Sequence, residues 1–183
     1  MRLFLALDLS DPLRQSMAEA INRLRPMAPR ARWVGAASLH LTLHFLGETG
    51  PDRLPALRAR LAQVQAAAVP LHLRGWGFFP DARPPRVFWV GVEPAPALLA
   101  LQAQLQARLV ELGWAAPGEA YTPHLTLARA RQGRELQALQ PLLSAPAPDW
   151  GEILVREYVL YQSRPRPGEH QYTPLARFAL RHA

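Results

Sequence analysis

Hydrophobic and polar residues alternate over several short stretches of this chain, and between them apolar residues recur three or four positions apart. Alternation is typical of a strand with one buried face, and the longer repeat is typical of an amphipathic helix. Strands are therefore predicted over residues 2–9, 32–34, 39–46, 69–79, 87–92, 121–130, 153–162 and 171–180. Helices are predicted over residues 13–26, 53–68, 98–112 and 134–143, with Gly113 as the stop signal of the third.

One four-residue sequence, His-Leu-Thr-Leu, occurs at residues 40–43 and again at residues 124–127. A shuffled chain of this composition would contain about 0.005 such matches, so two copies indicate an internal duplication. Phe4 and Phe88 precede the two copies by the same interval, and Pro12 and Pro96, which open two predicted helices, are as far apart as the copies. Each half is predicted as strand, helix, motif strand, helix and strand. We therefore expect an α+β fold in which residues 1–183 form a single domain of two similar, closely packed lobes.

Strand geometry sorts the residues of each copy onto two faces, because successive side chains point to opposite sides. In the first copy the leucines share one face, and His40, Thr42 and His44 share the other. In the second copy His124 and Thr126 share the polar face. We expect the leucine faces to be buried and the polar faces to meet across a cleft between the lobes.

Two His and two Thr that converge on one point are suited to phosphoryl chemistry. Imidazoles titrate near neutral pH, so one can take a proton from the attacking group while the other gives one to the leaving group. Threonine hydroxyls can donate hydrogen bonds to phosphate oxygens, and arginine can stabilise negative charge. A single His in a strand is usually structural, but the matched His-Thr pairs favour in-line displacement at a phosphodiester without a metal ion.

Metal and nucleotide cofactors have no support in the sequence. His40 and His44 have the spacing of a helical metal-binding pair, but strand geometry would place them roughly 13 Å apart, too far for both to bind one ion. The chain has no Cys, which excludes disulfides, a thiol nucleophile and a thiolate metal site. It also lacks a glycine-rich phosphate-binding loop. We therefore expect no cofactor.

The net charge of +7 comes entirely from arginine, since the sequence contains no Lys. Arginine matches the geometry of phosphate groups, so this balance fits a polyanionic partner such as RNA. A GC-rich genome, which favours Arg, Ala, Pro and Leu, would give the same composition. No apolar run approaches the ~18 residues of a membrane span, and Asp8 interrupts the N-terminal apolar stretch too early for a secretion signal. We therefore expect a cytoplasmic protein.

At these residues the chain resembles the two-histidine (2H) phosphoesterase superfamily, which is defined by two His-x-Thr-x motifs. More narrowly, it resembles the RNA 2′,3′-cyclic phosphodiesterases, also called 2′-5′ RNA ligases. The order and spacing of several segments make the likeness specific. These segments are residues 2–7, 32–34, 39–47 (LHLTLHFLG), 77–80, 85–92 and 123–129 (PHLTLAR), followed by Gly168, Tyr172, Leu175 and Phe178.

The resemblance implies two antiparallel sheets that line a central cleft in a bilobal fold with pseudo-twofold symmetry and helices outside. It implies hydrolysis of a 2′,3′-cyclic phosphate at an RNA end to a 2′-phosphate, by a protein that we expect to be a monomer. His124 would accept a proton from water, and His40 would donate one to the departing 3′ oxygen. Thr42 and Thr126 would hold the phosphate oxygens. The acid and base roles come from the family, because the sequence alone is symmetric between the two His.

Arg129, at the end of the second motif, is a further candidate contact to phosphate or RNA. Strict alternation places it on the leucine face, so this role requires the strand to end or bulge before it. His44 is expected on the cleft wall, either in contact with the substrate or as a solvated side chain, and the solvated interpretation is favoured.

Other aromatic residues and His near these segments are weaker candidates. Trp33, Phe45 and Tyr121 are candidates for stacking on a base, although core packing is favoured for each. The remaining His have no partner pattern and are interpreted as surface or structural residues; these are His72, His170 and His182.

Two other functions remain open on the sequence. The same residues would catalyse the reverse reaction, the 2′-5′ ligation of RNA (tRNA) halves, by microscopic reversibility. A basic RNA-binding module without turnover would explain the charge but not the paired His, because binding alone uses arginine and aromatic residues. Three results would separate these functions. Hydrolysis of a cyclic phosphate indicates the phosphodiesterase, joining of RNA halves without ATP indicates the ligase, and salt-dependent binding alone indicates the binding module.

Overall fold

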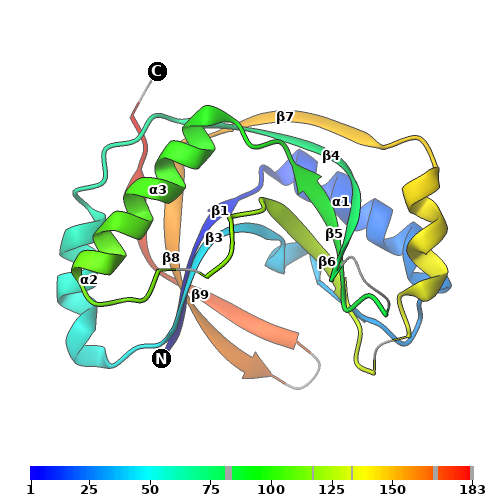
Figure 1. Cartoon of the computed structure of the whole chain (residues 1–183), viewed down its shortest axis with the longest axis horizontal. Coiled ribbons are helices and arrows are strands. Elements are labelled where there is room, and N and C mark those ends of the chain that lie inside the picture. The colour runs from blue at the N-terminus through cyan, green and yellow to red at the C-terminus, as the bar shows by residue number, and fades with distance from the viewer. Residues whose placement is uncertain (81–83, 117, 133, 167–168, 182–183) are drawn as a thin grey trace.

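The computed structural model describes residues 1–80, 84–116, 118–132, 134–166 and 169–181 (Figure 1). The strands are β1 (Arg2–Asp8), β2 (Arg32–Trp33), β3 (His40–Glu48), β4 (Val69–Phe79), β5 (Val87–Val92), β6 (His124–Arg129), β7 (Asp149–Val155), β8 (Glu157–Arg166) and β9 (Glu169–Ala179). The α-helices are α1 (Asp11–Leu24), α2 (Leu54–Leu61) and α3 (Pro96–Glu111). The 3₁₀ helices are η1 (Arg25–Met27), η2 (Ala36–Ser38), η3 (Pro51–Arg53) and η4 (Gln137–Ser144).

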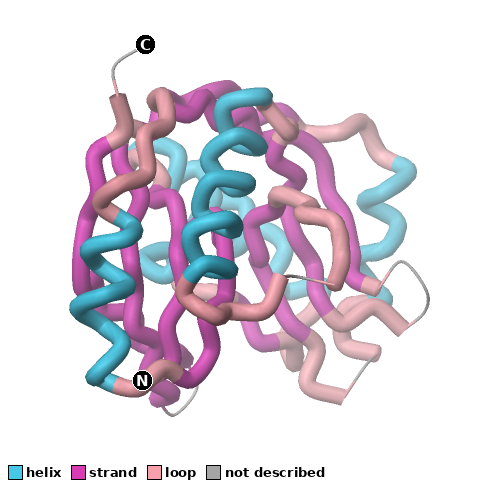
Figure 2. Tube along the Cα trace, turned by 60° about the vertical axis from the view of Figure 1, so that its left-hand side comes forward, coloured by secondary structure: helices cyan, strands magenta, loops and turns pink. Residues whose placement is uncertain are grey.

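These strands form two sheets in which every pairing is antiparallel. The first sheet has the order β3-β1-β8-β9, and the second has the order β2-β6-β5-β4-β7. The motif strands β3 and β6 contact each other where the sheets meet. Figure 1 shows α2 and α3 on one side of the sheets and α1 and η4 on the other, and Figure 2 shows helices both in front of and behind the strands. The predicted α+β fold, with two antiparallel sheets and helices outside, is confirmed.

The two sheets do not correspond to the two halves of the chain. The first sheet combines β1 and β3 with β8 and β9 from the end of the chain, whereas the second takes β2 and β4 from the first half. The single strand predicted over residues 153–162 is wrong, because the chain leaves the second sheet after Val155 and enters the first at Glu157. The lobes are therefore interleaved in the sequence rather than successive.

Two predicted helices are shorter or tighter than their hydrophobic repeats indicate. The segment 53–68 is α-helical only as far as Leu61, because Ala66 and Ala68 exchange backbone hydrogen bonds of 2.8 and 2.9 Å with Arg181. Pairing with the end of the chain thus overrides helix propensity. The segment 134–143 forms η4 instead of an α-helix, and Pro141 inside it has no N–H for an α-helical hydrogen bond.

The first and third predicted helices are confirmed as α1 and α3. Pro12 and Pro96 lie in their first turns, where a missing N–H costs no hydrogen bond. Gly113, just beyond α3, has a φ of 84°, a left-handed conformation that glycine adopts without strain. In the described part of the chain, no helix has the length and apolar composition needed to cross a bilayer.

Strand β1 pairs with motif strand β3, and strand β5 pairs with motif strand β6. The distance along the sequence from β1 to β5 differs from the distance between the two motifs. Their pairing places Phe88 in the position of Leu5 and Val87 in the position of Phe4. Phe4 and Phe88 are therefore not equivalent, and their matched distance from the motif His does not reflect the duplication. The segments between these strands and the motifs differ in length by one residue.

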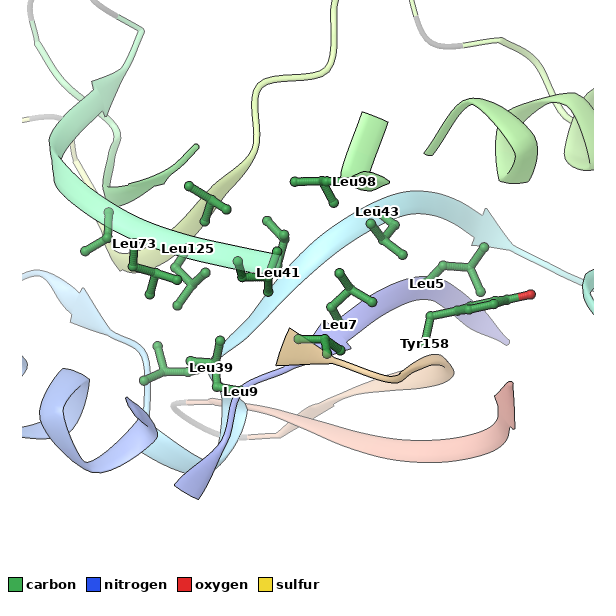
Figure 3. Packing of buried hydrophobic residues seen from close by; sticks show 14 of the residues in the cluster. Leu5, Leu7, Leu9, Leu39, Leu41, Leu43, Leu73, Leu98, Leu125 and Tyr158 are labelled. Carbon is green, nitrogen blue, oxygen red and sulfur yellow. The ribbon is translucent and has the colours of Figure 1, made fainter. Parts of the chain in front are cut away.

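A single hydrophobic core joins the two sheets and holds both motif strands. Leu41 of β3 and Leu125 of β6 are fully buried, in the same cluster as Leu7 of β1. Figure 3 shows these side chains close together. Burying a leucine stabilises the fold by roughly 1.5–3 kcal/mol, so the leucine faces anchor the strands firmly. The predicted burial of these faces is confirmed.

Candidate active site

The two motif strands share a backbone irregularity as well as a sequence. The pairing of β3 with β1 skips Leu43, and the pairing of β6 with β5 skips Leu127. Each skipped residue directly follows the Thr of its motif. Such a bulge adds one residue to one strand and reverses the alternation of the residues after it. The two strands accordingly have the same burial pattern over their first six residues.

The bulges decide which side chains reach the cleft beyond the His-Thr pairs. His44 and Ala128 lie on the core side and are 7% and 0% exposed. Phe45, which is 65% exposed, and Arg129 lie on the cleft side instead. The prediction that His44 shares the polar face of its motif is therefore wrong. The predicted role of Arg129 requires a bulge before it, and this bulge is present at Leu127. The Arg129 side chain lines the same cavity as the motif residues.

Each motif His is held by the carbonyl two residues earlier in the chain. Nδ1 of His40 lies 2.7 Å from the Ser38 carbonyl oxygen, and Nδ1 of His124 lies 2.7 Å from that of Thr122. A carbonyl oxygen can only accept a hydrogen bond, so Nδ1 carries the hydrogen in both rings. Nε2 of each ring is therefore the atom that is left to accept or donate a proton.

Aromatic rings from the first sheet fix the imidazole of His40. Its ring centroid lies 4.8 Å from that of Phe4 on β1 and 5.1 Å from that of Tyr172 on β9. The Tyr172 ring meets the imidazole edge-on, at an interplanar angle of 88°. Packed rings of this kind favour one orientation of the imidazole.

Aromatic rings from the second sheet fix the imidazole of His124 in a similar way. Its centroid lies 4.8 Å from that of Phe79 and 5.9 Å from that of Trp89. The Trp89 indole also covers Gly77, where a Cβ atom would lie only 2.0 Å from the ring. Glycine at this position therefore leaves the space that the Trp89 ring occupies beside His124, at an interplanar angle of 51° to the imidazole.

Burial lowers the pKa of both His40 and His124 below its ordinary value, because a charged imidazolium is poorly solvated inside the protein. The carbonyls that accept from Nδ1 oppose this effect, and the positive charge of Arg129 adds to it. Both rings are therefore biased toward the neutral form before an anionic ligand is present.

Two neighbouring charges act on His40 and not on His124: Asp8 raises the pKa of His40, and Arg14 lowers it. Asp8 on β1 stands opposite His40, and its negative charge raises the pKa of His40 against the larger effect of burial. The residue opposite His124 on β5 is Gly91, which carries no charge. The hydroxyl of Tyr161 donates to both oxygens of Asp8 at 2.9 Å and so fixes the carboxylate. Asp8 thus favours the protonated form of His40 in particular.

A cavity of about 520 Å³ brings together the residues predicted for catalysis and phosphate binding. Both His-Thr pairs and the arginine that follows the second pair line it: His40, Thr42, His124, Thr126 and Arg129. The expectation that the two polar faces meet at one cleft therefore holds in the structure. The chemical role of each side chain stays a prediction.

The same cavity contains residues that the sequence did not single out as site residues. Arg2, Ser163, His170 and Tyr172 also line it, and they come from β1, β8 and β9. The interpretation of His170 as surface or structural therefore misses its place beside the motif residues. A signal was available, because His170 and Tyr172 are two residues apart and so share one face of a strand.

A second cavity, of about 760 Å³, borders the other side of Thr42 and His124. His44 and Tyr121 line it together with Gln102 and Gln106 of α3. The Tyr121 hydroxyl donates to the backbone carbonyl of Thr42 at 3.0 Å, so it ties the segment before the second motif to the first. Tyr121 thus has both a structural contact and a place on a cavity wall.

Trp33 is packed into the protein and is not a lining residue of either cavity. Its indole N–H donates to the Ala28 carbonyl at 2.9 Å, and its ring lies 6.2 Å from that of Phe88. The favoured interpretation of Trp33 as a core residue is confirmed. Phe45, in contrast, is exposed and lines both cavities.

His72 lies on the surface and is a structural residue, as predicted. Its ring pairs with Glu93 at 3.2 Å and with Asp149 at 2.8 Å. His182 and Gly168 lie outside the described residues. Among the residues that are described, no group of three or more His, Asp or Glu side chains is placed to hold a metal ion.

Comparison with known proteins gives one consistent family. Residues 12–165 match the model of the 2′-5′ RNA ligase superfamily. A protein of Thermus thermophilus named RNA 2′,3′-cyclic phosphodiesterase is 35% identical over 201 aligned positions, which cover 99% of this chain and 91% of that protein. The crystal structure of TT0787 of Thermus thermophilus has a TM-score of 0.82 at 36% identity, covering 100% and 99% of the two chains. The structure of Escherichia coli LigT complexed with 3′-AMP has a TM-score of 0.81 at 30% identity, covering 98% and 97%. The chain therefore belongs to the 2′-5′ RNA ligase superfamily.

Proposed function

We propose that this protein hydrolyses 2′,3′-cyclic phosphate ends of RNA to 2′-phosphate ends. The observation that carries the proposal is the pair of matched His-Thr motifs in one cavity, each His with Nδ1 bound to a carbonyl and Nε2 left for proton transfer. The Thermus thermophilus relative named RNA 2′,3′-cyclic phosphodiesterase supports the same activity.

In the proposed reaction, Nε2 of His124 accepts a proton from a water molecule as its oxygen attacks phosphorus. The bond from phosphorus to the 3′ oxygen breaks, and Nε2 of His40 donates a proton to that oxygen. The products are a 2′-phosphate monoester and a 3′-hydroxyl. Proton exchange with solvent then restores neutral His124 and protonated His40. No step needs a metal ion, because the two imidazoles supply both proton transfers.

The charge of Asp8 supports this assignment of acid and base, although burial, Arg14 and Arg129 lower the pKa of His40. A general acid must start protonated, and Asp8 favours the protonated form of His40. A general base must start neutral, and burial together with Arg129 favours the neutral form of His124. The negative charge of a bound phosphate would raise the pKa of His40 further, so substrate binding would help to protonate the acid.

Thr42, Thr126 and Arg129 are proposed to bind the phosphate group. Each Thr precedes the bulge of its strand, so its hydroxyl lines the same cavity as the His of its motif. The two hydroxyls would donate to the non-bridging oxygens, and Arg129 would stabilise the negative charge that develops on them. Residues 1–183 are proposed to act as one domain, because a single hydrophobic core serves both motifs. A monomer in the cytoplasm is proposed from the sequence alone.

The test is hydrolysis of an RNA oligomer that ends in a 2′,3′-cyclic phosphate, in the presence of a chelator. We expect a 2′-phosphate product, and a loss of roughly 10²–10⁴-fold in kcat for His40→Ala and for His124→Ala. His72→Ala is the matched control, because His72 is bound to surface carboxylates outside both cavities. Full activity in either motif variant, or a product with only a 3′-phosphate, would refute the proposal.

The second cavity gives a specific reason to test the reverse reaction as well. It borders His124 and has room for a nucleoside beside the proposed proton acceptor. A 5′-hydroxyl of a second RNA bound there would replace water as the nucleophile and give a 2′-5′ linkage. Incubation of RNA halves without ATP, followed by a search for the joined product, separates ligation from hydrolysis.

A further inference from the structure

Four basic side chains from separate strands lie close enough to interact, and three of them line the catalytic cavity. We call Arg2 of β1, Arg32 of β2, Arg129 of β6 and His170 of β9 the basic cluster. Arg2, Arg129 and His170 line the cavity directly. Arg32 pairs in register with Arg129, so the two side chains lie next to each other on the second sheet. In Figure 1 the β8–β9 hairpin, which brings His170 to the cluster, projects from the first sheet.

The carboxylates whose side chains the structure describes do not pair with the arginines of this cluster, Arg2, Arg32 and Arg129. The residue opposite Arg2 on β3 is Glu48, but its carboxylate pairs with the N-terminal ammonium at 3.3 Å. Like charges in directly opposite strand positions destabilise a sheet, so this arrangement favours a bound anion.

The electrostatic effects on the cluster show that its members lie close enough to act on one another. Burial lowers the pKa of Arg129, and the charges of Arg32 and Arg2 lower it further. Burial also lowers the pKa of His170, and the same three arginines add to the effect. An anion placed between these groups would relieve this repulsion.

One phosphate is not enough to neutralise the cluster. In the proposed reaction the cyclic phosphate lies between the two His-Thr pairs. Arg129, three residues after Thr126, lines the cavity beside them. That leaves Arg2, which lines the cavity opposite Ser163 of β8, and Arg32, which pairs with Arg129 and whose charge acts on His170 of β9. In an RNA strand the next negative charge is the phosphodiester one nucleotide upstream of the end.

We propose that Arg2 and Arg32 bind this upstream phosphodiester, so that the site prefers the end of an RNA strand to a free nucleoside 2′,3′-cyclic phosphate. The proposal rests on the proposed function and adds a second phosphate subsite to it. A guanidinium can donate two parallel hydrogen bonds to a phosphate, which suits arginine to this task. The contact is proposed to hold the substrate and the transition state equally well, and such a contact lowers KM without raising kcat.

The experiment compares three substrates with one wild-type preparation. They are a nucleoside 2′,3′-cyclic phosphate, a dinucleotide that ends in the same group, and that dinucleotide with a neutral methylphosphonate as its internal linkage. We expect kcat/KM for the charged dinucleotide to exceed that for the mononucleoside by about 10- to 100-fold, the effect of one or two charge-assisted hydrogen bonds. The methylphosphonate should behave like the mononucleoside.

The variants Arg2→Gln and Arg32→Gln remove the proposed contacts and leave the motif residues intact. Each should raise KM for the charged dinucleotide about tenfold with kcat unchanged, and neither should change hydrolysis of the mononucleoside or of the methylphosphonate. Arg23→Gln, on the exposed end of α1, is the matched control and should change none of these values. Unaltered turnover of the mononucleoside shows that each variant is folded.

Two results would overturn the subsite while leaving the proposed function in place. The first is equal kcat/KM for the charged and the methylphosphonate dinucleotides. The second is an equal loss with all three substrates in Arg2→Gln or Arg32→Gln. A wild-type protein that hydrolyses none of the cyclic phosphates would instead overturn both the proposed function and the subsite.

Discussion

Gly77 has no contact with substrate in the proposed mechanism, yet replacing it with Ala should impair catalysis. A Cβ at this position would lie 2.0 Å from the Trp89 ring, whereas carbon atoms prefer separations of about 3.5–4.0 Å. The indole would have to move by roughly 1.5 Å, and its ring packs against both Phe79 and His124. A misplacement of about 1 Å at reacting groups can cost about 10²-fold in rate, so we expect a loss of roughly 10- to 100-fold in kcat for Gly77→Ala.

The same substitution should reduce stability, because overpacking a well-filled region typically costs about 1–3 kcal/mol. The assays are hydrolysis of a cyclic phosphate RNA end and thermal denaturation. Gly35→Ala is the matched control, because a Cβ at Gly35 would contact nothing within 4 Å and its φ of −69° is ordinary for alanine. This control should keep both activity and melting temperature.

A second substitution tests whether Trp89 transmits the effect. Trp89→Phe shortens the ring that Gly77→Ala would displace. It also removes a buried indole N–H that has no hydrogen-bond partner among the described residues. The double variant should therefore recover much of the activity lost in Gly77→Ala. Wild-type kcat in Gly77→Ala, or no recovery in the double variant, would refute the role of Trp89 in holding His124.

Three further outcomes follow from the pKa directions and from the core. Because burial lowers the pKa of both His40 and His124, the bell-shaped profile of kcat/KM should have its maximum below pH 6.5, and a flat profile between pH 5 and 8 would contradict the acid-base pair. Asp8→Asn removes the charge that raises the pKa of His40, so the limb on which activity falls with rising pH should move to lower pH, while the other limb stays in place. A shift of both limbs together would count against Asp8 acting through His40. Leu125→Ala should lower the free energy of unfolding by about 2–5 kcal/mol in urea denaturation, since Leu125 is fully buried in the shared core.

The positions of the His and Thr side chains follow from the sequence alone, but those of the residues after them do not. Alternation predicts that the leucines are buried and that His40 and Thr42 point into a cleft, and the structure agrees. The bulge at Leu43 then reverses the faces of His44 and Phe45. No glycine or proline marks this bulge in the sequence. It becomes visible only when the neighbouring strand β1 is known.

Long-range pairing accounts for the other differences. Residues 153–162 resemble one strand because both parts are apolar, and only the partners β4 and β1 reveal that the chain changes sheets between them. His170 joins the site because β9 pairs with β8, and β8 pairs with β1 at the opposite end of the chain. The sequence singles out Arg129 and places His170 on one strand face with Tyr172. Local patterns contain no information on strand partners, so they do not show that these residues meet Arg2 and Arg32.

The passage of the chain from one sheet to the other at Arg156 has a consequence for biosynthesis. The sheet that holds His40 is complete only when β8 and β9 have paired with β1, so the first half of the nascent chain cannot finish either lobe. At ribosomal rates of about 5–20 residues per second, the edge of β1 waits on the order of ten seconds for its partner. A strand edge left open for that time invites pairing with other chains. We therefore expect the nascent chain to need protection of the β1 edge, by the ribosome surface or by a chaperone, until β8 has been synthesised.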